Sequence, residues 1–165
     1  MKKFIKKIVL FLSPCFLILC LIVVADPFKV WFNYDDYNSA VTQNGEHVRF
    51  KLFNNNKDKY HFDSFIFGSS RSHAYKTQEW KKHLKDSASP FLFCASSEGI
   101  YGILNKLKYL DNLNNPIKNV LLVLDEHCMR GNSNKKGHLY ISTPALSNES
   151  SLEFYKTFVV ASLNV

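Results

Sequence analysis

The longest apolar run in the chain lies near its N-terminus, where residues 8–25 carry no charged side chain. These eighteen residues, at about 1.5 Å each in a helix, approach the length that crosses the hydrocarbon core of a bilayer. Four lysines precede the run and Asp26 follows it, so the positive-inside rule predicts a cytoplasmic N-terminus. Pro14 lies inside the run, which a membrane span tolerates. Residues 1–25 are therefore predicted to form a signal anchor, a transmembrane helix.

The same segment has a second interpretation, as a cleaved signal peptide. Val23 and Ala25 occupy the small-residue positions of a cleavage site. The run is longer than the usual apolar core of a signal peptide, which favours an uncleaved anchor. Both interpretations export residues 26–165 to the outer, periplasmic or extracytoplasmic, side. We therefore expect a single-pass membrane protein with the lipid bilayer as a partner.

Residues 26–60 are aromatic and polar without clean periodicity, and we interpret them as a juxtamembrane connector. Asn44-Gly45 predicts a turn. A short helix is predicted over residues 46–53, followed by a polar loop over residues 54–59.

Beyond residue 60, short apolar runs alternate with helical patterns. A continuous aliphatic run such as residues 120–124 is typical of a strand covered on both faces, as in a parallel sheet. The alternation predicts two βαβ units. Residues 61–165 are thus predicted to form a partial three-layer α/β/α domain with a flavodoxin-like parallel sheet. The predicted strands are residues 64–67, 91–94 and 120–124, and the predicted helices are residues 72–86, 98–113 and 152–163.

The helix over residues 98–113 has the clearest pattern in the exported part of the chain. Its apolar residues follow a helical stripe, whereas Lys106 and Lys108 lie off it. We therefore expect both lysines to face solvent. The stripe consists of Ile100, Ile103, Leu104, Leu107 and Leu110.

Charge changes this picture little. The formal net charge of +7 includes four lysines from the N-terminal anchor, and the remainder carries 17 basic and 14 acidic side chains. The basic balance therefore belongs partly to the export signal, and nucleic acid is not an expected partner. A hydrophobic fraction of 46% with 14 Phe excludes a disordered chain.

Three polar segments follow the predicted strands: residues 68–73, 95–99 and 125–127. In an open parallel sheet, ligands bind beyond the carboxyl ends of the strands. A serine at such a strand end can expose its hydroxyl, and the nearby backbone N–H groups can stabilise an oxyanion. The alternative is that Ser70 or Ser72 merely caps the following helix.

The stretch Phe65-Ile66-Phe67-Gly68-Ser69-Ser70-Arg71-Ser72-His73 resembles the first block of the SGNH (GDSL-like) hydrolase superfamily. It is closest to the membrane-anchored, cell-envelope branch, in which this block reads Gly-Ser-Ser-Arg. Residues 93–99 resemble the second block, and residues 121–125 resemble the strand before the third. The resemblance covers residues 60–128. It implies an esterase or acyltransferase that acts on envelope polysaccharide.

The resemblance also implies residue roles. Ser70 takes the nucleophile position, and Gly99 supplies an N–H to the oxyanion hole. Ser69, Arg71 and Asp125 are the expected substrate-binding residues.

Two parts of the family pattern are missing. The asparagine of the third block is replaced by Asp125-Glu126-His127, and no Asp-x-x-His follows residue 128. His127 is the candidate substitute base. The chain therefore resembles the N-terminal part of such a protein, apparently truncated, and we expect weak activity or none from it alone.

Other functions remain open at this point. The chain could be a non-catalytic, membrane-tethered binding or scaffold protein of the envelope, or a truncated gene product. No cofactor and no metal are predicted, because the spacing of His, Cys, Asp and Glu matches no ligand pattern. Export permits a disulfide between Cys94 and Cys128 without requiring it, and two small apolar residues at strand ends are the alternative.

Overall fold

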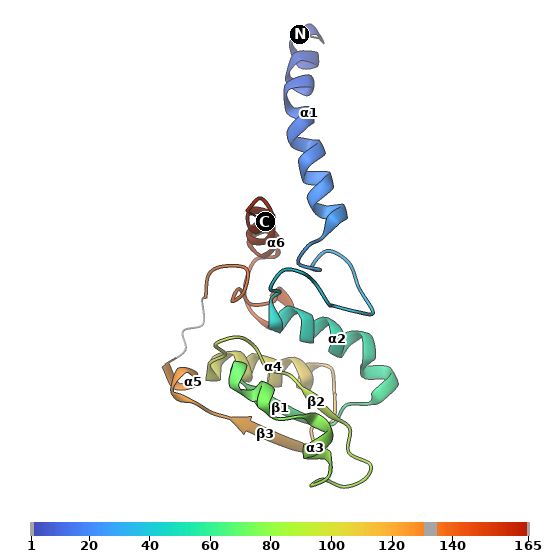
Figure 1. The fold of residues 1–165 in the computed structure, drawn as a ribbon, viewed down its shortest axis with the longest axis vertical. Helices are drawn as coiled ribbons and strands as arrows, with labels where there is room; N and C mark the ends of the chain where they lie inside the picture. Colours follow the sequence, from blue (N-terminus) through green and yellow to red (C-terminus); the bar gives the residue numbers. More distant parts are fainter. Residues whose placement is uncertain (1, 131–134, 165) are drawn as a thin grey trace.

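The computed structural model describes residues 2–130 and 135–164. Helix α1 (Lys2–Ala25) extends away from the rest of the chain (Figure 1). Residues Lys3–Ala25 are long and apolar enough to cross a membrane, and almost all of their side chains are exposed. The predicted N-terminal apolar helix is thus confirmed.

The centre of the remaining chain is a three-stranded parallel sheet in the order β2-β1-β3. Phe65 of the central strand lies opposite Phe91 on one side and Val120 on the other. The fold is therefore mixed α/β with a small parallel sheet, as the strand and helix pattern predicted. The strands are β1 (Ser64–Gly68), β2 (Pro90–Leu92) and β3 (Asn119–Val123).

Two helical connections join the strands. The short helices η1 (Ser70–Ala74) and α3 (Thr77–Lys81) connect β1 to β2, where one longer helix had been predicted. Helix α4 (Ile100–Asn112) connects β2 to β3, and α5 (Glu126–Arg130) follows β3.

Helix α2 (Gly45–Tyr60) is longer than the sequence predicted. The Asn44 side chain accepts a hydrogen bond from His47 N at 3.0 Å, so Asn44-Gly45 begins the helix instead of forming a turn. The helix also continues through the predicted polar loop. Within the extension, Asn54 Oδ1 accepts a hydrogen bond of 2.8 Å from the Tyr109 hydroxyl, and the helix ends at His61, which adopts a left-handed conformation and donates its N–H to the Lys57 carbonyl oxygen.

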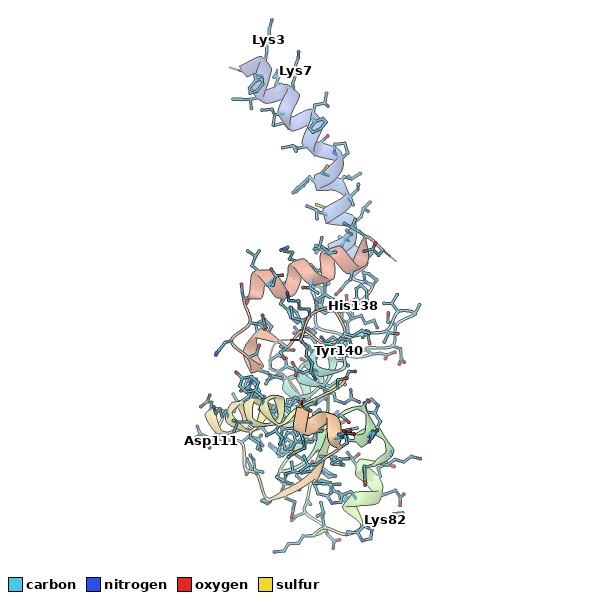
Figure 2. All side chains as sticks on the ribbon, turned by 90° about the vertical axis from the view of Figure 1, so that its left-hand side faces the viewer. Lys3, Lys7, Lys82, Asp111, His138 and Tyr140 are labelled. Carbon is cyan, nitrogen blue, oxygen red and sulfur yellow. The ribbon has the colours of Figure 1, made fainter. Side chains whose placement is uncertain are left out.

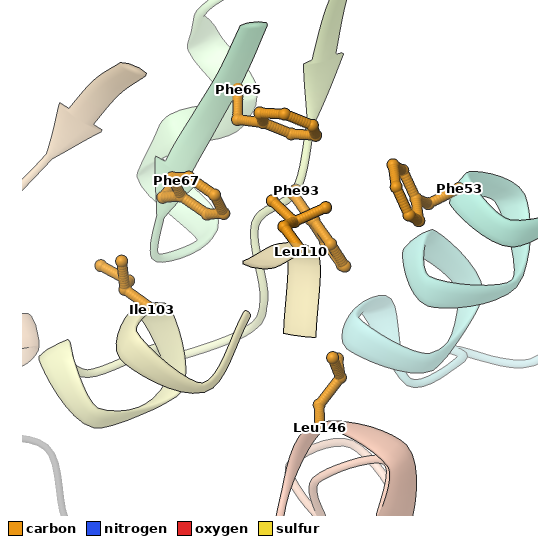
Figure 3. Packing of buried hydrophobic residues seen from close by; sticks show 7 residues of the cluster. All are labelled: Phe53, Phe65, Phe67, Phe93, Ile103, Leu110 and Leu146. Carbon is orange, nitrogen blue, oxygen red and sulfur yellow. The ribbon is translucent and has the colours of Figure 1, made fainter. Parts of the chain in front are cut away.

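The main core lies between the sheet, α2 and α4 (Figure 3). It is rich in aromatic rings, whose centroids lie about 5.6 to 6.2 Å apart where Phe53 and Phe67 each meet Phe93. Such offset ring contacts stabilise a core beyond the area that they bury. The buried members of this core are Phe53, Phe65, Phe67, Phe93, Ile103, Leu110 and Leu146, the last from the short helix η2 (Pro144–Leu146).

A second, smaller core joins the segment after α1 to the C-terminal part of the chain. Helix α6 (Ser151–Ser162) agrees within one residue with the predicted terminal helix. It buries Phe154 and Phe158 against Phe28, Val30 and Ile141. The base of α1 and helix α6 are therefore held by the same cluster.

The prediction that residues 120–124 are covered on both faces is wrong. Strand β3 lies at the edge of the sheet and pairs only with β1. Val120 and Leu122 remain 42% and 48% exposed. The cores described above cover the central strand but end short of this edge.

The prediction for the lysines of α4 is half wrong. Lys108 is exposed, as expected, but Lys106 is fully buried. Ile100 and Leu104 of the predicted stripe are exposed instead. The buried face of α4 is therefore rotated from the apolar stripe, because Lys106 has a charged partner inside the protein.

Candidate functional site

The loop after the central strand begins with a glycine that the fold requires. Gly68 has a φ of +150°, and a Cβ at this position would lie 2.5 Å from the backbone oxygen of Val123. Only glycine lets the ends of β1 and β3 approach this closely. The approach places the residues that follow each strand side by side.

Ser69 and Asp125 meet at the carboxyl ends of β1 and β3. The buried Ser69 Oγ donates a hydrogen bond of 2.5 Å to Asp125 Oδ2, and Cys128 N donates to Asp125 Oδ1 at 2.9 Å. These two bonds, with the Arg71 guanidinium 3.7 Å from Oδ2, lower the pKa of Asp125 to about 2. The carboxylate is thus charged at neutral pH and ties the two loops together.

Ser70 stands on the exposed side of the same loop. It is the first residue of η1, and among the residues that the structure describes its hydroxyl has no hydrogen-bond partner. The cap of η1 is Ser69, whose Oγ accepts from Arg71 N at 3.4 Å. The buried Ser72 instead donates to the Ser69 carbonyl oxygen at 2.6 Å. The alternative that Ser70 or Ser72 is the helix cap is therefore wrong.

A second arginine reaches this loop from α2. Arg49 Nη2 donates to His73 Nε2 at 3.2 Å. Partial burial and the Arg49 charge both lower the pKa of His73. A guanidinium can only donate, so the imidazole accepts with Nε2 and is neutral in this contact. The sequence analysis missed Arg49, because nothing in the pattern of α2 shows that it faces a loop 24 residues further along the chain.

The loop after β2 lies beside the same strand end. Ala95 N donates to the Gly68 carbonyl oxygen at 3.2 Å, and Gly99 is the N-cap of α4. Gly99 lines a small cavity of about 30 Å³ together with Asn44, Ser96 and Glu98. Ser70 is not among the residues that line this cavity. Of the predicted site residues, Ser69, Arg71 and Asp125 therefore lie in contact, whereas Gly99 lies in a neighbouring pocket.

A buried ion pair holds this second loop on α4. Lys106 Nζ donates to Glu98 Oε1 and, at 3.1 Å, to the carbonyl oxygen of Phe93. The ammonium also lies 5.1 Å from the centre of the Phe93 ring. Burial raises the pKa of Glu98, and the Lys106 charge opposes this rise. A side chain at position 102 would crowd this carboxylate, since an added Cβ would lie 3.0 Å from Glu98 Oε1.

The remaining candidate residues are His127 and the two cysteines outside α1. The side chain of His127, the candidate substitute base, lies outside the described residues. Cys94 and Cys128 are buried free thiols. In the described part of the chain, no three His, Cys, Asp or Glu side chains are grouped as a metal site would require.

No protein-family model, curated protein or solved structure matches this chain. The function must therefore be argued from the geometry of the strand ends and from the apolar helix α1.

Proposed function

We propose that this chain is a membrane-anchored, SGNH-like protein whose exported domain binds acyl esters of envelope polysaccharide through the loop after β1. Ser70 is the nucleophile of this proposal. The observation that carries it is the exposed and unengaged hydroxyl of Ser70 at the end of the central parallel strand. Ligands of open parallel sheets bind at this position.

The charges around Ser70 fit an ester or an anionic group. Arg71 follows the serine directly, and Arg49 reaches the same loop through His73. The Ser69–Asp125 hydrogen bond keeps the backbone of the loop in place. In the proposed reaction, Ser70 Oγ attacks the acyl carbonyl carbon and releases the sugar hydroxyl. Water, or an acceptor hydroxyl, then takes the acyl group from the serine.

The proposed reaction is slow in this chain. A serine hydroxyl needs a neighbouring base to be a good nucleophile at neutral pH. Within the described residues no histidine contacts Ser70, and His73 already accepts from Arg49. The Ser70 proton would therefore pass to solvent, and the departing sugar oxygen would take a proton from solvent. The oxyanion would be stabilised by backbone N–H groups, for which we propose that of Ser70 and, on the resemblance alone, that of Gly99 in the neighbouring pocket.

Two further parts of the proposal concern architecture. We place α1 across the membrane with its lysine-rich start in the cytoplasm, which the positive-inside rule supports. We also propose that the sheet belongs to a three-layer domain. This is supported by Trp80 of α3, which lines a surface pocket with Leu121, whereas Val120 and Leu122 alternate to the opposite face.

A fluorophosphonate probe tests the nucleophile. The full-length chain in detergent is incubated with the probe, and the labelled residue is located by mass spectrometry. We expect slow labelling at Ser70 that disappears in Ser70→Ala but persists in Ser87→Ala, an exposed serine in the loop before β2. If folded protein takes up no label, or if Ser87→Ala loses it equally, Ser70 is not an activated nucleophile.

The second candidate function is binding without catalysis. The Arg49–His73 contact favours it, because it occupies the imidazole nearest to Ser70 in sequence. Calorimetric titration with an O-acetylated oligosaccharide and its deacetylated form separates the two functions. Binding that depends on the acetyl groups and on Arg49, without turnover or probe labelling, supports a binding module. Arg49→Gln is the test variant, and Lys82→Gln, at the exposed residue that follows α3, is the control.

A further inference from the structure

Helix α6 exposes apolar side chains on the face that its own core does not use. Phe154 and Phe158 are buried. On the opposite side, Leu152 is 79%, Val160 53% and Leu163 62% exposed. Residues separated by eight and eleven positions return to nearly the same side of a helix. The helix and its C-cap residue Leu163 thus expose three large apolar side chains on the face where a surface helix normally presents mainly polar ones.

The charges on the outer face are few and paired. Lys156 Nζ lies 3.3 Å from Glu153 Oε2, three residues earlier on the same helix. The pair is neutral as a unit, and its two side chains are exposed. A lysine stem of this kind can lie along an apolar surface with its ammonium in the polar layer. This composition fits the boundary between lipid headgroups and acyl chains better than it fits water.

The position of α6 indicates what covers this face. The helix lies across the base of α1, on the side of the domain from which α1 departs (Figures 1 and 2). Lys82 lies at the opposite end of the molecule (Figure 2). A bilayer that surrounds α1 would therefore meet α6 before any other part of the domain.

The junction between α1 and the domain is well defined. Asp26 Oδ1 accepts from Val30 N at 2.8 Å, and Oδ2 accepts from Trp31 N and from the Tyr34 hydroxyl at 2.9 Å each. Trp31 stacks on Tyr155 of α6 with ring centres 4.6 Å apart. Trp and Tyr are enriched at membrane–water interfaces. The carboxylate and the ring stack thus fix α6 relative to the end of the anchor.

We propose that α6 is an interfacial helix, with Leu152, Val160 and Leu163 inserted into the outer leaflet of the membrane that α1 crosses. The inference rests on the membrane anchoring proposed above. The two attachments together hold the exported domain in one orientation, whereas α1 alone would leave the chain free to rotate about the axis of α1 in the membrane. Since the charges described on the outer face, Glu153 and Lys156, pair with each other, we expect insertion to be independent of anionic lipid and of salt.

Depth-dependent quenching tests this proposal on the full-length chain in lipid nanodiscs. Cys15 and Cys20 are replaced by alanine, and a single Leu152→Cys, Leu163→Cys or Lys82→Cys substitution is then labelled with the dye NBD. The buried Cys94 and Cys128 are kept, and a chain without an added cysteine measures any labelling there. A Cys20→Ala chain that retains Cys15 reports on α1.

The expected result is shallow insertion of α6. Labels at Leu152 and Leu163 should be quenched more by lipids with a nitroxide at carbon 5 than at carbon 12. Iodide should quench them at least about threefold less than the label at Lys82, as expected for a helix at the headgroup boundary. The result should be the same in neutral and in anionic nanodiscs.

Each other outcome is decisive. If Cys15 is quenched by lipid while the α6 labels behave like the Lys82 label, α1 is anchored and the interfacial helix is refuted. If the α6 labels are shielded from both iodide and lipid nitroxides, a protein surface covers them and the lipid assignment is wrong. If the Cys15 label is not quenched by lipid, the anchoring itself fails.

Discussion

Replacing Lys106 by methionine should destabilise the domain strongly, although lysine is an ordinary surface residue. The Lys106 side chain is fully buried, and that of Glu98 is 1% exposed. Methionine keeps an unbranched apolar stem, one atom shorter than that of lysine, but leaves the Glu98 carboxylate buried without a cation. It also removes the donor to the Phe93 carbonyl oxygen.

The magnitude follows from the burial of both groups. Two unit charges about 4 Å apart attract each other by about 4 kcal/mol at an effective dielectric constant near 20. The lost hydrogen bond adds about 1 kcal/mol. Removing one partner of a buried pair costs about 3–5 kcal/mol in other proteins. We therefore expect Lys106→Met to lower the free energy of unfolding by about 3–5 kcal/mol.

The loss should depend on pH in a defined direction. Burial already raises the pKa of Glu98 above its usual 4.5, and removal of the Lys106 charge raises it further. A raised carboxyl pKa means that the folded state binds more protons than the unfolded state. Stability is then greatest below pH 4.5 and falls as the pH rises through the folded-state pKa. The deficit of Lys106→Met should therefore be smaller at pH 5 than at pH 8.

Urea titration of the full-length chain in mild detergent, followed by far-ultraviolet circular dichroism, measures these differences. Lys108→Met, at an exposed position on the same helix, is the matched control and should change stability by less than about 0.5 kcal/mol. Adding Glu98→Gln to Lys106→Met should recover part of the loss and abolish its pH dependence. Equal stability of Lys106→Met and Lys108→Met would refute the assignment of a buried, energetically coupled pair.

Two further predictions concern other buried positions. Burial, with a contribution from Lys51, lowers the pKa of His47 to about 4. The free energy of unfolding should therefore be greatest above pH 6.5 and fall by up to about 3 kcal/mol as the pH drops toward 4. Urea titrations of His47→Gln should not show this loss. Gly68→Ala should lower the free energy of unfolding by about 1–3 kcal/mol more than Gly137→Ala does. Both glycines have a positive φ, but only a Cβ at position 68 would meet backbone within 4 Å. Equal melting temperatures for the two variants would contradict this.

Several features of the chain follow from local sequence. An uncharged apolar run makes α1 a helix of membrane-spanning length whatever lies around it. Short apolar runs bounded by polar loops placed β1 and α6 within one residue of their observed positions. The parallel pairing of the strands also follows from local sequence, since each helical connection returns the chain to the end of the sheet where the previous strand began. The roles proposed for Ser70 and Gly99 remain predictions.

Tertiary packing decided the rest. Helix α2 extends to Tyr60 through a polar C-terminal half, in which Asn54 accepts a hydrogen bond from Tyr109, 55 residues further along the chain. Arg49 joins the candidate site only because α2 crosses beside η1. Lys106 is buried because a carboxylate from a preceding loop neutralises it, and no periodic pattern within α4 contains that partner. Local pattern specifies which segments are apolar, but the identity of each buried neighbour depends on residues outside that pattern, which become adjacent only when the chain folds.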